Sequence, residues 1–135
     1  NHLAARRHLQ ARYREEVDLG SVVVDEADRP FMERLLEVID AHLGNPDLTV
    51  GQIADEMALS RRQLSRRVKE ATGEPPGAFL RTYRIEQATA MLEAEPDTIS
   101  EVAYAVGFKS PSSFSQSFRE HVGVSPSTYV DGQSD

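Results

Sequence analysis

The stretch from Thr49 to Lys69, TVGQIADEMALSRRQLSRRVK, decides the fold that we expect for this chain of 135 residues. It predicts two short helices that meet at a tight turn, because each helix begins with the pattern of a capping box. Thr49 stands three residues before Gln52, and Ser60 stands three residues before Gln63. The second helix carries basic residues at positions 61, 62, 66, 67 and 69. The stretch therefore predicts a helix-turn-helix whose second helix is strongly basic.

A second copy of the pattern runs from Thr98 to Arg119, as TISEVAYAVGFKSPSSFSQSFR. Capping, core and stop positions stay in step between the copies, with one residue inserted before the second serine cap. The identical pairs are Thr49/Thr98, Ala54/Ala103, Ser60/Ser110, Ser65/Ser115, Glu70/Glu120, Gly73/Gly123 and Pro76/Pro126. Helical solenoids also repeat, but they need more than two units. We interpret the repeat as a duplicated helix-turn-helix, spanning about 49–70 and 98–121.

Apolar residues at helical spacing predict the other helices of an all-α domain over residues 30–130. One helix is expected over 31–43, a long linker helix over about 76–95, and a short last helix that starts at Pro126. A thin apolar stripe over 3–16 indicates a connector helix, so residues 1–29 are assigned to a connector and linker from an upstream domain. Residues 131–135 are expected to form a polar tail.

The charge of the chain is unevenly distributed. The net charge is −7, which by itself disfavours nucleic acid. Residues 60–73, however, carry +5 − 1 = +4, whereas residues 31–59 carry +1 − 6 = −5. The chain has no cysteine, and its four histidines lack the spacing of metal ligands. We expect no metal, no cofactor and no catalytic residues.

These residues resemble the C-terminal DNA-binding domain of the AraC/XylS transcription regulators, over about Phe31 to Val130. The second half carries the most specific signature, from Ile99 through Gly107-Phe108 to Tyr129. The other matching positions are Ala54, Leu59, Ser60, Leu64, Arg66, Lys69, Gly73, Arg84, Ala88, Leu92, Val102, Ala103, Val106, Phe114, Ser115, Phe118, Gly123, Ser125 and Pro126.

The resemblance implies seven helices, two helix-turn-helix subdomains joined by a long linker helix, and an asymmetric site of about two turns of double-stranded DNA. It assigns base reading to the exposed positions of the two second helices: Arg62, Ser65, Arg66, Ser112, Ser113 and Gln116. Phosphate contacts are expected from Arg61, Lys69, Arg81, Arg84, Lys109 and Arg119. Gln116 stands where a basic residue is common in the family, so the second reading helix is nearly neutral.

The linker helix suggests how both second helices reach DNA. About 20 residues give a helix of roughly 30 Å, which is close to the ~34 Å between successive major grooves on one face of B-DNA. The sequence therefore predicts two recognition helices in adjacent major grooves.

The partners that the resemblance implies are double-stranded DNA, RNA polymerase, and an upstream receiver or sensor domain, in a cytoplasmic, nucleoid-associated protein without membrane contact by this segment. The arginine-rich segment before residue 20 also resembles the junction that follows a receiver domain in two-component or hybrid two-component proteins. An ordinary ligand-sensing member remains the alternative. A rival for the domain itself is a helical protein-interaction module that keeps the fold without binding DNA.

Overall fold

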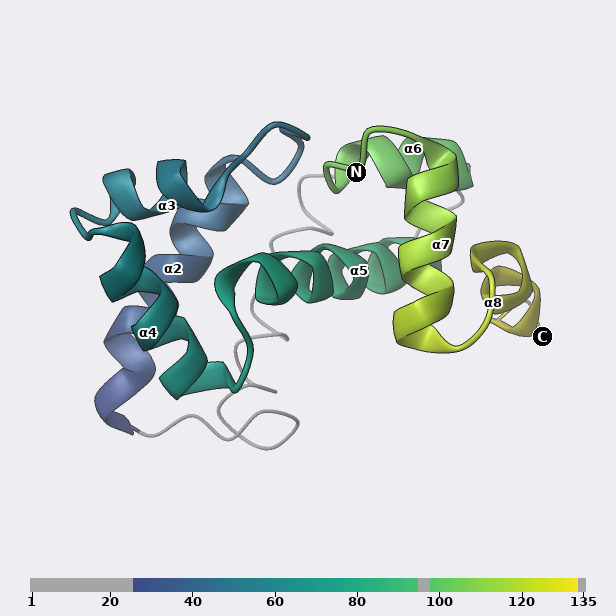
Figure 1. Cartoon of the computed structure of the whole chain (residues 1–135). Helices are drawn as coiled ribbons and strands as arrows, with labels where there is room; N and C mark the ends of the chain where they lie inside the picture. The colour runs from purple at the N-terminus through teal and green to yellow at the C-terminus, as the bar shows by residue number, and fades with distance from the viewer. Residues whose placement is uncertain (1–25, 95–97, 134–135) are drawn as a thin grey trace. The chain divides into compact units, whose positions relative to one another are not determined.

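Every element that the structure describes is helical (Figure 1). The computed structural model describes residues 26–94 and 98–133, so the predicted connector helix over 3–16 lies outside them. Within these ranges a short 3-10 helix precedes seven α-helices, which confirms the predicted all-α, seven-helix fold. Their bounds are η1 Glu26–Asp28, α2 Arg29–Ala41, α3 Val50–Glu56, α4 Arg61–Thr72, α5 Pro76–Ala94, α6 Ile99–Ala105, α7 Pro111–Val122 and α8 Pro126–Gln133.

The helix ends differ slightly from those predicted. α2 begins two residues before Phe31, with Pro30 in its first turn, and ends at Ala41 because the His42 amide turns back to the Ile39 carbonyl at 3.0 Å. α8 runs to Gln133 and so takes in residues 131–133, which the sequence had assigned to a polar tail.

The chain divides into two compact units. In the described residues, the N-terminal unit comprises 26–42 and 47–80, and the C-terminal unit comprises 43–46, 81–94 and 98–133. The C-terminal unit therefore includes the short segment that joins α2 to α3. Each unit contains one of the two predicted helix-turn-helix motifs.

The N-terminal unit has an aliphatic core. α3 packs against both α2 and α4, and each helix buries one face. The buried residues are Leu35, Leu36, Val38 and Ile39 of α2, Ile53 and Ala54 of α3, and Leu64 and Val68 of α4. Most of these residues have another buried residue three or four positions away, as expected for a helix that buries one face.

The C-terminal unit has an aromatic core. Phe108, Phe114, Phe118 and Tyr129 form a continuous series, with successive ring centroids 5.4, 5.5 and 5.5 Å apart. Edge-to-face and tilted contacts of this kind contribute about 0.5–1.5 kcal/mol each beyond the area they bury. The Tyr129 hydroxyl also donates to Glu93 of α5. These contacts hold α7 and α8 to the rest of the unit.

Candidate nucleic-acid interface

Capping boxes fix the starts of three of the helices. In α3, the Thr49 Oγ1 accepts from the Gln52 amide at 3.1 Å, and the Gln52 Oε1 accepts from the Thr49 amide at 2.9 Å. The boxes that begin α4 with Ser60/Gln63 and α6 with Thr98/Glu101 are formed in the same way. The two capping boxes predicted for the first helix-turn-helix are therefore confirmed, and the second motif begins with a box of the same kind.

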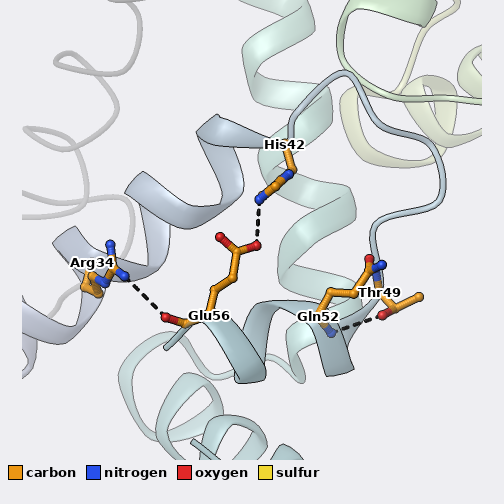
Figure 2. A network of polar contacts seen from close by, with 5 residues as sticks. All are labelled: Arg34, His42, Thr49, Gln52 and Glu56. Carbon is orange, nitrogen blue, oxygen red and sulfur yellow. Dashed lines mark hydrogen bonds and ion pairs between the residues drawn. The ribbon is translucent and has the colours of Figure 1, made fainter. Parts of the chain in front are cut away.

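A polar network braces α3 against α2 (Figure 2). Glu56, the last residue of α3, accepts from the His42 Nε2 at 2.6 Å through its carboxylate. Its backbone carbonyl accepts from the Arg34 Nη2 at 3.3 Å. Because α4 begins five residues after Glu56, the contact with His42 helps to fix the position from which α4 starts.

α4 presents the predicted reading residues on its exposed face. Leu64, Val68 and Ala71 are buried, while the opposite face is exposed along the helix. The predicted DNA-contacting residues that are exposed on α4 are Arg61, Arg62, Ser65, Arg66 and Lys69. Arg66 lies near Glu70 with its Nε 3.9 Å from a carboxylate oxygen, and both side chains are about two-thirds exposed. α4 thus brings all five predicted residues together on one surface.

Arg67 has a different role from its neighbours. Its guanidinium lies 4.2 Å from the ring centroid of Phe31, over the ring face, and the residue is half-buried. This is a cation–π contact within the N-terminal unit. In the sequence Arg67 is one more charge of the basic helix, whereas in the structure its side chain faces α2 and packs on Phe31.

α7 presents the second set of predicted residues. Phe114 and Phe118 are buried, whereas Ser112, Ser113, Gln116 and Arg119 are exposed, and Lys109 is exposed in the preceding turn. The Ser113 hydroxyl lies 2.9 Å from that of Ser110, whose oxygen also accepts from the Ser113 amide. Ser113 is therefore partly engaged in capping its own helix.

Arg84 was predicted to contact phosphate, but the structure places it in the interior of the C-terminal unit. Its side chain is buried, with 9% relative exposure, and both terminal nitrogens donate to backbone carbonyls. Burial lowers the pKa of the guanidinium from its ordinary value. A sequence signal was present, since Arg84 lies four residues after Leu80 and four before Ala88 on the apolar face of the helix. Arg81, one turn earlier, is exposed as a phosphate contact requires.

The described residues contain neither a metal-binding cluster nor a membrane-spanning helix. No group of histidine, aspartate and glutamate side chains there is arranged to hold a metal ion. None of the described helices is long and apolar enough to cross a membrane.

Many known proteins resemble the chain, and two solved domains and one longer protein illustrate the range. The DNA-binding domain of AdpA, a global transcriptional factor solved with a target DNA, is 34% identical with a TM-score of 0.66, over 73% of this chain and 91% of that one. The C-terminal domain of AraT, a response regulator from Geobacillus stearothermophilus, is 31% identical with a TM-score of 0.70, over 76% and 85%. A protein of Formosa agariphila named histidine kinase P4 is 27% identical over 96% of this chain and 10% of its own length.

A family described as a helix-turn-helix domain matches residues 34–132. Together with the capped helix pairs and their exposed second helices, this match defines a DNA-binding domain of a transcription regulator. The chain belongs to the AraC/XylS type of these regulators, a family of DNA-binding regulators rather than of enzymes. It spans less than half of the length of the curated relatives that it matches.

Proposed function

We propose that the chain binds a specific double-stranded DNA sequence, with α4 and α7 in adjacent major grooves, and thereby regulates transcription. The observation that carries this proposal is the exposed face of α4, where four cations surround Ser65. Four cations on one helix face repel one another, which destabilises the fold. The same cations complement the negative charge of the DNA phosphates.

The two helices receive different roles. On α4, Arg62, Ser65 and Arg66 read bases, and Arg61 and Lys69 hold phosphates. An arginine can bond to O6 and N7 of one guanine, which discriminates against other bases by about 1–3 kcal/mol. On α7, Ser112, Ser113 and Gln116 read bases. Lys109 and Arg119 hold phosphates there, as does Arg81 on α5.

The length of α5 supports a two-groove arrangement. Its 19 residues correspond to about 28 Å, comparable to the ~34 Å between successive major grooves on one face. A single chain would then supply the two reading helices that dimeric regulators take from two subunits.

The wider setting is also a proposal. Residues 30–130 form the DNA-binding domain, residues 1–29 connect it to an upstream receiver or sensor domain, and residues 131–135 end the segment. The Formosa agariphila match, to a protein named as a histidine kinase, extends over nearly the whole chain and supports a hybrid two-component protein, with a ligand-sensing regulator as the alternative. We propose with this a protein of the cytoplasm that acts at the nucleoid, with RNA polymerase as a second partner and no catalytic role for this domain.

Selection of bound sequences from a random DNA pool tests the proposal. We expect two enriched blocks whose centres lie about 10–10.5 base pairs apart, one for each reading helix. The logarithm of the binding constant for the selected site should fall linearly with the logarithm of the salt concentration. The slope should be about −0.9 for each phosphate contact. Absence of enrichment would favour a protein-interaction module, and a single enriched block would contradict the two-groove arrangement.

A further inference from the structure

Arg84 is the only charged residue that is buried in the described part of the chain. In the C-terminal unit its Nη1 donates to the Gly107 carbonyl, and its Nη2 donates to the Asn45 carbonyl, each at 2.9 Å. Burying a cation costs several kcal/mol unless it is well bonded. Burying an apolar side chain on this face of α5 would cost less free energy than burying a guanidinium. The two hydrogen bonds are therefore the contribution that requires an arginine at this position.

The first bond reaches the turn that precedes α7, and the second reaches the segment 43–46, which lies against that turn. Gly107 lies in this turn, three residues before the Ser110 cap, with a φ of +94°. A Cβ at Gly107 would lie 2.2 Å from the Leu43 carbonyl oxygen and 2.8 Å from the Arg84 Cζ. The backbone of the turn is therefore enclosed between the guanidinium and the segment 43–46. Hydrogen bonds from a cation are about twice as strong as neutral ones, so this enclosure is firm.

The N-terminal unit contains a weaker version of the same contact. Arg34, on the helix before the first helix-turn-helix, donates to the Glu56 carbonyl at 3.3 Å from an exposed position. A solvent-exposed contact of that length contributes little. The buried arrangement is specific to the unit whose reading helix has few charges of its own.

We propose that Arg84 is a positioning residue for α7: it fixes the α6–α7 turn and so the direction in which Ser112 and Gln116 meet the bases. It touches no DNA. The inference rests on the proposed function, and it gives the neutral reading helix a means of contributing specificity. Hydrogen bonds to bases need accurate geometry, whereas attraction to phosphates tolerates displacement.

The test compares two DNA duplexes, the full selected site and the same site with the α7 block scrambled. We expect the wild-type chain to prefer the full site by about 10- to 100-fold, as base contacts worth 1–3 kcal/mol imply. Arg84→Met removes both donors at similar length, and it should bring this ratio close to one while leaving affinity for the scrambled site almost unchanged. An unchanged ratio, or equal weakening on both duplexes, overturns the proposal.

Three matched variants separate positioning from charge and from folding. Arg81→Met removes an exposed cation from the same helix and should weaken both duplexes equally, leaving the ratio intact. Asn45→Ala keeps the backbone carbonyl that accepts from the Arg84 Nη2, so the preference between the two duplexes should be retained. Arg84→Lys keeps the charge but cannot span both carbonyls with a planar fork, so its ratio should be intermediate; a full wild-type ratio would overturn the proposal.

Hydrogen exchange without DNA distinguishes the failure of this inference from failure of the proposed function. The Phe108 amide bonds to the Ala103 carbonyl at 3.0 Å across the turn. It should exchange faster in Arg84→Met than in wild type, while the Leu59 amide of the N-terminal unit keeps its rate. If the wild-type chain shows no preference between the duplexes, the proposed function has failed. If the Phe108 exchange rate is unchanged, the positioning role has failed.

Discussion

Ala58 and Gly107 occupy equivalent positions in the two helix-turn-helix motifs, and both have a left-handed backbone, with φ of 57° and 94°. In each motif the next amide returns to the first helix: Leu59 to the Ala54 carbonyl at 2.9 Å, and Phe108 to the Ala103 carbonyl at 3.0 Å. The duplication seen in the sequence thus extends to the backbone of the turns. Only one of the two turns uses the residue that this conformation favours.

Ala58→Gly should stabilise the N-terminal unit. An L-residue in the left-handed region costs about 1–2 kcal/mol, and glycine removes this cost but loses more conformational entropy on folding. We expect a net gain of about 0.5–1 kcal/mol in the free energy of unfolding, measured by urea denaturation. The control is Ala90→Gly in the helical interior of α5, which should destabilise by about 1 kcal/mol. A loss of stability in Ala58→Gly would contradict the assignment of strain.

Gly107→Ala should be much more damaging than Gly73→Ala, although both glycines have positive φ. A Cβ at Gly73 has no atom within 4 Å, so the substitution costs only the backbone strain of about 1–2 kcal/mol. At Gly107 the Cβ would collide with the Leu43 carbonyl, a backbone atom that has no rotamer with which to move away. We expect a loss of more than about 4 kcal/mol by equilibrium unfolding. Similar losses in the two variants would show that the turn relaxes around the added methyl.

Glu56→Gln tests the network that braces α3 against α2. The carboxylate accepts from His42 at a partly exposed site, so its contribution is limited by solvent. We expect a loss of about 0.5–1 kcal/mol in the free energy of unfolding, because a neutral amide accepts a weaker hydrogen bond. The neighbouring Asp55→Asn provides the control and should change stability little. Equal effects would mean that only the local negative charge matters.

Local patterns in the sequence predicted local structure well. A capping box needs only two side chains three residues apart, so Thr49 with Gln52 was sufficient to locate the start of α3. The same holds for the apolar faces of the helices, since Leu64 and Val68 lie one turn apart and face one side. All six candidates for base reading and five of the six candidates for phosphate contacts lie at exposed positions. They do so because the helix face opposite a predicted core is exposed.

Features that depend on contacts distant in sequence were not predicted. Arg84 is buried because the segment 43–46 and Gly107 enclose it, and no pattern near residue 84 specifies those partners. Its basic character suggested a phosphate contact, although its position on the apolar stripe indicated burial. Arg67 was likewise counted as one more surface cation, whereas its partner Phe31 lies far earlier in the sequence. For these two arginines, the position on the helix indicated burial better than the charge indicated exposure.

The two reading helices should contribute unequally to affinity. Replacing Arg62 and Arg66 by alanine removes two cations, so we expect a large loss of affinity together with a shallower salt dependence. Replacing Ser112 and Gln116 by alanine should leave the salt slope almost unchanged but relax selectivity at the α7 block. Fluorescence anisotropy at several salt concentrations, on the full and scrambled sites, measures both quantities. Equal changes in salt slope for the two double variants would refute the asymmetry.

Glu70→Gln should tighten DNA binding. The Glu70 carboxylate lies 3.9 Å from the Arg66 Nε on the exposed face of α4, so it competes with phosphate for that cation and repels the DNA itself. An exposed pair of this kind contributes about 0.2–1 kcal/mol, which sets the expected gain at about 1.5- to 5-fold in affinity at low salt. The gain should shrink as salt screens the carboxylate. Glu37→Gln, which removes an exposed charge from α2, should give a smaller change. Weaker binding by Glu70→Gln would instead show that the carboxylate holds Arg66 in its reading orientation.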